Sequence, residues 1–175
     1  MDRSQTVCFS GHRPEKLAIP YLENSDRVRQ IKTLLAVRIE AAVREGYTNF
    51  LTGMAKGVDL FAAELVLGFR RNNPSLRLIA VEPYHGHGMT WSAEWRNRHQ
   101  VIQEQCDEVI TLSASYNKSC FNDRNVYLVD HASRLIAVCN GSPSGTRNTI
   151  RYATLQGVDV ELIDISHEIP LLIWR

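Results

Sequence analysis

Three segments of the chain combine glycine, hydroxyl and basic residues in patterns that suit phosphate binding. The first, GSPSGT at residues 141–146, lies between an apolar run and a helix-like stretch. Glycine lets a ligand approach the backbone, and a helix start offers unpaired N–H groups at the positive end of its dipole. We therefore predict that Ser144, Gly145 and Thr146 bind an anion. The alternative is a tight loop with Thr146 as N-cap. The segment is neither a P-loop nor a GxGxxG loop.

The second segment, TGMAKGVD at residues 52–59, places Gly53 and Gly57 ahead of another predicted helix. Its Asp59 has two interpretations. Asp is a favoured helix N-cap, so the side chain could simply begin the helix. Acidic residues beside nucleotides also bind ribose hydroxyls, so Asp59 could contact a sugar instead.

The third segment, SGHR at residues 10–13, follows a predicted strand. Arginine contacts phosphate through two parallel hydrogen bonds, which makes Arg13 a candidate, and His12 could exchange protons near neutral pH. Ser10 and Gly11 complete the segment. Taken alone, a surface turn with solvated charges would be the favoured interpretation, but its position beside the other two segments raises the case for a ligand site.

Two further stretches are weaker candidates. The residues NDRN at 122–125 open a predicted helix, where an isolated arginine is usually a surface residue. The loop from Tyr84 to Trp91 has aromatic residues at both ends and could close over a base. Its HGH sequence at 85–87 invites a metal interpretation, but further ligands are missing nearby and we predict no metal site.

The stretch from Trp91 to His99 interleaves aromatic and basic residues. Such a pattern can stack and neutralise single-stranded nucleic acid. It is also the pattern of an amphipathic helix with tryptophan in the core, which we favour.

The elements that must position these residues alternate along the chain. Apolar runs predict strands at residues 6–10, 49–52, 76–81, 108–112, 135–139 and 158–165. Helical periodicity and capping residues predict helices at about 26–45, 59–71, 92–105, 121–133 and 146–156. We therefore predict an α/β fold, a three-layer Rossmann-like domain with a mainly parallel sheet of about six strands. Ligands of such sheets bind at the carboxyl ends of the strands, where the candidate loops fall.

Composition narrows the functional classes. The 175 residues suggest one domain, residues 1–175, with an apolar tail at 166–175. The net charge of +1 gives no global field for nucleic acid or an acidic membrane. Four widely spaced cysteines favour free thiols, with Cys8 and Cys139 packed in strands, and no apolar run is long enough to span a membrane. We expect a cytoplasmic protein.

Four stretches, in order, resemble the SLOG superfamily, which unites DNA-processing protein A (Smf/DprA) with the LOG cytokinin-activating proteins. They cover about residues 6–165 and are CFSGHRPEKL, LTGMAKGVDLFAAE, NDRNVYLVDHASRLIAV and NGSPSGTRNTIRYA. Within the superfamily, the chain is most similar to the YpsA-like branch of bacteria and phages.

This resemblance implies a Rossmann-like fold that binds a nucleotide or nucleotide-derived ligand. The positions that match the ligand loops of the family are Ser10, Gly11, His12, Arg13, Gly53, Gly57, Asp59, Arg124, Asn125, Gly145 and Thr146. LOG enzymes are phosphoribohydrolases with a catalytic glutamate soon after a GGxGT loop. Here no acid follows Thr146 at 147–149, so Arg124 is expected to lack its carboxylate partner, and that mechanism is not implied.

We therefore expect a protein that binds or senses a nucleotide or an ADP-ribose-like ligand, with no obligatory cofactor and no membrane partner. The alternative is a hydrolase of such a ligand, with His12, Asp59 and Glu94 as acid–base candidates. Single-stranded nucleic acid is a third partner class, which the balanced charge does not favour. A homo-oligomer, with the apolar tail against a partner subunit, is compatible with the sequence.

Overall fold

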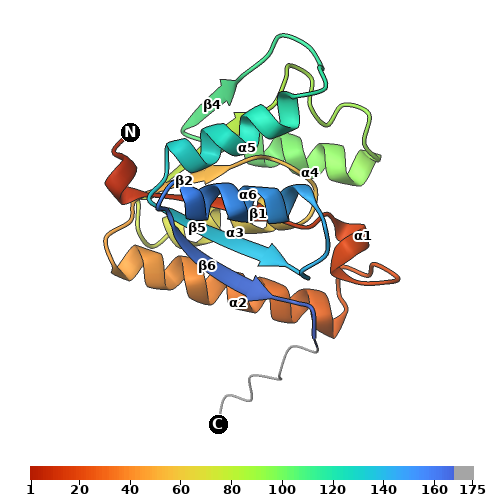
Figure 1. Cartoon of the computed structure of the whole chain (residues 1–175), viewed down its shortest axis with the longest axis horizontal. Coiled ribbons are helices and arrows are strands. Elements are labelled where there is room, and N and C mark those ends of the chain that lie inside the picture. The colour runs from red at the N-terminus through yellow and green to blue at the C-terminus, as the bar shows by residue number, and fades with distance from the viewer. Residues whose placement is uncertain (168–175) are drawn as a thin grey trace.

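A six-stranded parallel sheet forms the centre of the protein, in the order β4-β3-β2-β1-β5-β6 (Figure 1). The computed structural model describes residues 1–167. The strands are β1 (Thr6–Gly11), β2 (Asn49–Thr52), β3 (Arg77–Glu82), β4 (Glu108–Thr111), β5 (Arg134–Cys139) and β6 (Asp159–Asp164). From β1 the chain moves outward to β4 and then returns to the other side of β1. The strand order therefore reverses between β1 and β5, the point at which open parallel sheets form a crevice.

Helices cover both faces of the sheet (Figure 1). One layer contains α2 (Asp26–Arg44), α3 (Val58–Arg70) and α4 (Ala93–Gln103), and the other contains α5 (Cys120–Asp130) and α6 (Gly145–Leu155). Each layer packs on its own cluster of buried apolar side chains. Along β1, Val7 and Phe9 belong to the first cluster and Cys8 to the second. Because both faces are buried, the strands are continuous apolar runs instead of alternating ones.

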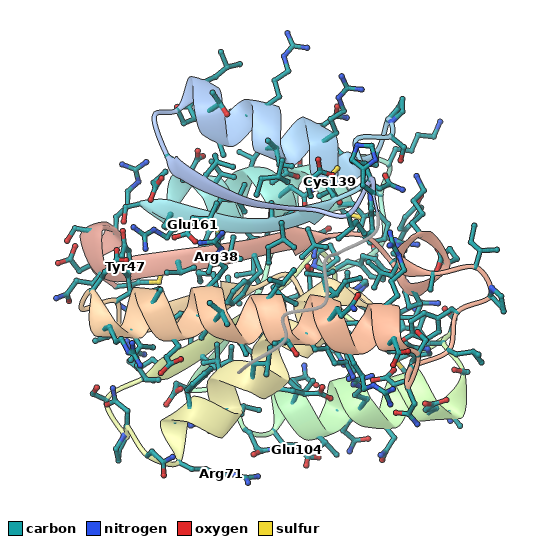
Figure 2. The ribbon with its side chains drawn as sticks, turned by 90° about the horizontal axis from the view of Figure 1, so that it is seen from below. Arg38, Tyr47, Arg71, Glu104, Cys139 and Glu161 are labelled. Carbon is teal, nitrogen blue, oxygen red and sulfur yellow. The ribbon has the colours of Figure 1, made fainter. Side chains whose placement is uncertain are left out.

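The free edge beside β6 is held by charged side chains (Figure 2). Nε of Arg38 in α2 lies 3.5 Å from Oε2 of Glu161 in β6. Arg134 of β5 forms ion pairs with Asp159 at 2.8 Å and Glu161 at 3.1 Å, and its guanidinium carbon lies 4.7 Å from the ring centre of Tyr47. These contacts fix the end of the sheet opposite β4.

The α/β prediction is confirmed, and the observed strands and helices agree with the predicted ranges to within a few residues. Two short helices were not predicted: the 3-10 turn η1 (Arg3–Gln5) and α1 (Pro14–Leu17). Proline at the first position of α1 supplies its dihedral angle in advance, a signal that the sequence carried. Of the predicted apolar tail, residues 168–175 lie outside the described part.

Candidate functional site

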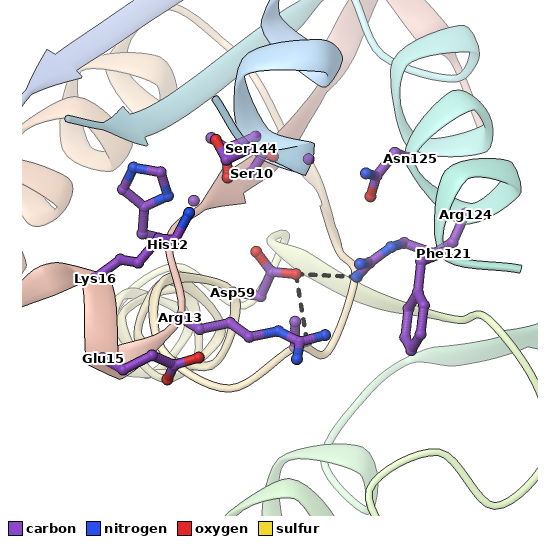
Figure 3. A pocket seen from close by; sticks show the side chains of 14 residues that line it. Ser10, His12, Arg13, Glu15, Lys16, Asp59, Phe121, Arg124, Asn125 and Ser144 are labelled. Carbon is purple, nitrogen blue, oxygen red and sulfur yellow. Dashed lines mark hydrogen bonds and ion pairs between the residues drawn. The ribbon is translucent and has the colours of Figure 1, made fainter. Parts of the chain in front are cut away.

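A cleft of about 300 Å³ lies where the strand order reverses, at the carboxyl ends of β1 and β5 (Figure 3). Most of the predicted ligand residues line it; Gly53, Gly57 and Tyr84 do not. The lining comes from the end of β1, the loop into α1, the loop before α3, and the starts of α3, α5 and α6. Its members are Ser10, Gly11, His12, Arg13, Glu15, Lys16, Ala55, Asp59, Phe121, Arg124, Asn125, Ser144, Gly145 and Thr146.

Gly53 and Gly57 shape the wall behind the cleft. The carbonyl of Gly53 accepts a hydrogen bond from Arg124, and a Cβ at Gly53 would overlap that guanidinium. Gly57 has φ +91°, and a Cβ there would lie 2.6 Å from the carbonyl oxygen of His12. Glycine at position 53 leaves room for the Arg124 guanidinium, and glycine at position 57 allows both the positive φ and the close approach to the His12 carbonyl. The two glycines therefore shape the wall and do not line the cleft themselves.

Tyr84 lies beside the cleft, in an aromatic cluster. Its ring centre is 5.5 Å from His87, 5.6 Å from Tyr116 and 6.1 Å from Phe121, with the ring planes inclined at 76–83°. Phe121, which is in contact with Tyr84, lines the cleft. Tyr84 does not itself line the cleft, and its contact with a ligand stays a prediction.

Asp59 and Arg124 form a buried ion pair on the cleft floor, with Oδ2 and Nη1 3.1 Å apart (Figure 3). Asp59 is the second residue of α3 and Gly57 is the N-cap, so Asp59 is not the cap. Its Oδ2 also accepts a hydrogen bond from the Ala55 N–H at 3.3 Å. The acid that follows the LOG loop is missing after Thr146, as the sequence indicated, but Arg124 pairs with a carboxylate from the segment after β2, which sequence reasoning did not predict.

In this pair each charge favours the ionised form of its partner, whereas burial disfavours both ionised forms. Burial raises the pKa of Asp59, while the nearby Arg124 and Arg13 guanidiniums pull that pKa down. Burial lowers the pKa of Arg124, and the Asp59 carboxylate raises it. Since an arginine is not deprotonated in proteins, the guanidinium is a fixed positive charge on the cleft floor.

Several polar groups of the cleft have no hydrogen-bond partner among residues 1–167. Asp59 uses only Oδ2, which leaves Oδ1 unpaired, and Arg124 uses only Nη1. Ser10 and Thr146, each 7% exposed, have hydroxyls with no partner in the described chain. Among these atoms Arg124 Nε is fully buried, whereas the free oxygens of Asp59, Ser10 and Thr146 open onto the cleft, where they can hydrogen-bond a molecule that enters it.

The start of α6 adds backbone donors to the same space. Ser144 is the N-cap, because its hydroxyl accepts a hydrogen bond from the Arg147 N–H at 3.3 Å. The predicted alternative, Thr146 as N-cap, is therefore wrong. The N–H groups of Gly145 and Thr146 stay without a partner in the described chain and lie at the positive end of the helix dipole.

His12 is buried and organises the loop between β5 and α6. Its Nε2 lies 2.7 Å from Oδ1 of Asn140, and that Oδ1 accepts hydrogen bonds from the N–H and hydroxyl of Ser142. Burial lowers the pKa of His12 below its usual value and so favours the neutral ring. In this arrangement His12 positions the loop before α6.

Four cleft residues were missed by sequence reasoning: Glu15, Lys16, Ala55 and Phe121. Lys16 follows Arg13 by three residues, and Phe121 precedes Arg124 by three, a spacing that puts side chains on one helical face. Lys16 was missed because the helix over residues 14–17 was not predicted. Phe121 was missed because its spacing from Arg124 was not used, although their helix was predicted.

The remaining candidates lie elsewhere. Glu94 lines a separate groove beside α3 and α4. Trp95 packs on the core and on Arg98, which confirms the amphipathic-helix interpretation of residues 91–99. Over residues 1–167, no three His, Cys, Asp or Glu side chains come together as metal ligands, and no helix is both long and apolar enough to cross a membrane. All four cysteines are free, and Cys8 and Cys139 are buried.

The chain is similar in sequence to one protein family and to several known proteins. The model of the YspA SLOG family (YpsA) matches residues 7–166. The chain is 28% identical over 144 residues to YoqJ, an uncharacterized SPbeta prophage-derived protein of Bacillus subtilis, a match that covers 75% of this chain and 84% of that protein. It is 27% identical over 146 residues to a UPF0398 protein of Halalkalibacterium halodurans, covering 80% and 77%.

Two solved structures share the fold. DNA processing protein A from Streptococcus pneumoniae matches with a TM-score of 0.60 and 19% identity, over 96% of this chain and 52% of that protein. The counterpart from Helicobacter pylori, whose structure describes a single-stranded DNA binding mode, gives a TM-score of 0.58 and 20% identity, over 90% and 64%. The chain therefore spans between half and two thirds of these longer proteins, and the likeness is one of fold.

Proposed function

Because the chain belongs to the YspA SLOG family, whose model matches residues 7–166, we propose that its cleft binds a nucleotide or nucleotide-derived ligand. The observation that carries the proposal is the set of nearly buried polar groups left without partners in the cleft. Ser10, Asp59, Arg124 and Thr146 are each less than 10% exposed. A ligand with both acceptors and donors would satisfy all four at once.

A phosphate group suits the donors. The N–H groups of Gly145 and Thr146, the hydroxyls of Ser10 and Thr146, and the guanidinium of Arg124 all line one cleft. Phosphate oxygens accept such bonds readily at a helix start, and the charge-assisted bond to arginine is the strongest of them. Lys16 and Arg13 at the rim add positive charge.

A sugar hydroxyl suits the acceptor. Within the described residues, Oδ1 of Asp59 has no hydrogen-bond partner, while Oδ2 accepts hydrogen bonds from Arg124 and Ala55. A carboxylate fixed on one side and open on the other accepts a hydrogen bond from a ribose hydroxyl, as acidic groups do in dinucleotide-binding sheets. Phosphate and ribose are two of the three parts of a nucleotide.

The test is calorimetric titration with AMP, ADP-ribose, ribose 5-phosphate and inorganic phosphate. Thr146→Val removes one hydroxyl at nearly constant volume, and we expect it to weaken binding about tenfold, the effect of one hydrogen bond to a charged group. Thr154→Val, on the exposed last turns of the same helix, is the matched control and should change affinity less than twofold. Absence of binding by all four compounds would overturn the proposal. Analysis of the same mixtures for released base or phosphate tests hydrolysis.

Single-stranded DNA is the second candidate, favoured because the Helicobacter pylori protein of the same fold has a single-stranded DNA binding mode. It predicts that affinity for an oligonucleotide exceeds that for a mononucleotide and falls steeply with added salt. Titration of a short oligo-dT at two salt concentrations distinguishes the two. Equal affinity for strand and mononucleotide would exclude this second candidate.

A further inference from the structure

Phe121 presents an aromatic side chain to the cleft. The residue is half-buried and lines the ligand space at the start of α5 (Figure 3). It lies one turn before Arg124 on the same helical face, so one helix start brings both side chains to the cleft.

Three aromatic rings surround Phe121 at inclined angles. Tyr84, His87 and Tyr116 have ring centres 5.8–6.2 Å from that of Phe121, with planes inclined at 76°, 67° and 58°. Among residues 1–167, no aromatic ring stacks flat on Phe121. Inclined contacts of this kind are favourable and fix the position of the ring, which remains half-buried on the cleft wall.

Arg13 provides a second planar group beside this surface. Its guanidinium carbon lies 5.7 Å from the ring centre of Phe121. Within the described chain, this exposed side chain forms no hydrogen bond or ion pair, and its contact there is the cation–π contact with Phe121. Aromatic faces and arginine planes are the two surfaces on which nucleobases stack.

We propose that the ligand of the cleft carries a nucleobase, which stacks on Phe121 with Arg13 alongside, while its phosphate lies at the start of α6. The inference rests on the proposed function, which concerns the phosphate and the ribose, and it adds a base as the third group of the ligand. It selects a nucleoside phosphate over a sugar phosphate that lacks a base.

The experiment compares AMP, GMP, CMP and UMP with ribose 5-phosphate on the wild-type protein and on Phe121→Leu. Leucine keeps the apolar contact with Tyr84 but removes the ring face. We expect at least one nucleotide to bind wild type more tightly than ribose 5-phosphate. In the variant that nucleotide should bind about tenfold more weakly, since stacking on one base has an effect of this size, and ribose 5-phosphate should change less than twofold. Phe121→Trp, which keeps an aromatic face, should retain nucleotide binding.

The outcomes separate the two proposals. If ribose 5-phosphate binds as tightly as every nucleotide, or if Phe121→Leu weakens both kinds of ligand equally, the base inference is overturned and the phosphate–ribose site stands. If none of these compounds binds wild type, the proposed function is overturned and the base inference with it. Melting temperatures of both variants within a few degrees of wild type confirm that the comparison is made between folded proteins.

Discussion

Two arginines that lie mostly out of solvent, Arg98 and Arg124, use their guanidinium groups in opposite ways. Arg98 of α4 donates through Nε and Nη2 to Glu64 and through Nη1 to Glu23. Its guanidinium carbon lies over the rings of Phe61 and Trp95, 4.9 and 5.0 Å from their centres. All three of its nitrogens have partners. Arg124 of α5 uses Nη1 alone, toward Gly53 and Asp59.

The difference distinguishes an arginine whose hydrogen bonds join two helices from one that keeps unused donors at a cleft. A buried ion pair stabilises a fold only when its remaining hydrogen-bonding capacity is satisfied, as it is around Arg98. Around Arg124, Nε is buried without a partner in the described chain, and the carboxylate of Asp59 is half used. The same residue types thus join α3 and α4 in one place and leave free binding capacity in a cleft in the other.

The largest effect should come from removing the guanidinium of Arg124. In Arg124→Met the buried carboxylate of Asp59 loses its counter-charge, and we expect the free energy of unfolding to fall by about 3 kcal/mol, with loss of phosphate-ligand binding. Urea unfolding and calorimetric titration measure the two effects.

Arg98→Met is the matched variant. Glu23 and Glu64 have side chains 28% and 38% exposed, so water can solvate them, and Lys32 still pairs with Glu23. We expect a loss of about 1 kcal/mol and no more than a twofold change in ligand affinity. Equal effects of the two substitutions on ligand binding would contradict the distinction between the two arginines.

A smaller effect should follow from crowding Arg124 without removing it. In Gly53→Ala the added Cβ overlaps the guanidinium, so Arg124 must shift away from Asp59, and we expect about 2 kcal/mol of destabilisation with weakened ligand binding. Gly68→Ala is the control, because that glycine is exposed in α3 with no atom within 4 Å of the added Cβ. It should stabilise the protein by about 1 kcal/mol, the usual helix preference for alanine. A stable Gly53→Ala protein with unchanged affinity would show that the position of Arg124 is not critical.

The smallest effect concerns His87, whose two ring nitrogens are buried and have no partner in the described chain. Burial, with Arg124 and His99 nearby, lowers its pKa from 6.5 to about 3. The unfolded chain therefore binds a proton on His87 at a pH where the folded protein does not, and stability falls as the pH decreases below about 6.5. Between pH 6.5 and pH 5 this amounts to about 1.5 kcal/mol.

The measurement is urea unfolding of wild type and His87→Gln at those two pH values. The loss on acidification should be smaller in the variant, and His85→Gln, at an exposed position of the same loop, is the control. An equal loss in wild type and His87→Gln would mean that His87 is not held neutral by its surroundings.

Much of the site could be predicted because its parts are local. The loops at 10–13 and 141–146 each end a strand and precede a helix, and the rule for parallel sheets brings such loops to one edge. Tyr84 shows where local reasoning ends: it was predicted as a ligand residue, but the ring that lines the cleft is Phe121 of α5, whose centre lies 6.1 Å from that of Tyr84. The spacing of Phe121 from Arg124 was a local signal for one helical face, but only the tertiary structure shows that this face lines the cleft.

By itself, the sequence determined the alternation of strands and helices, and therefore the parallel sheet and the edge at which its polar loops gather. Those features depend on periodicity and on glycine, which act over a few residues. Only the tertiary structure decided which charges pair. Asp59 and Arg124 are 65 positions apart. Gly53 leaves room for the Arg124 guanidinium that reaches Asp59. Pairing over that separation depends on how α3 and α5 approach the sheet from opposite faces, which no short stretch of sequence encodes.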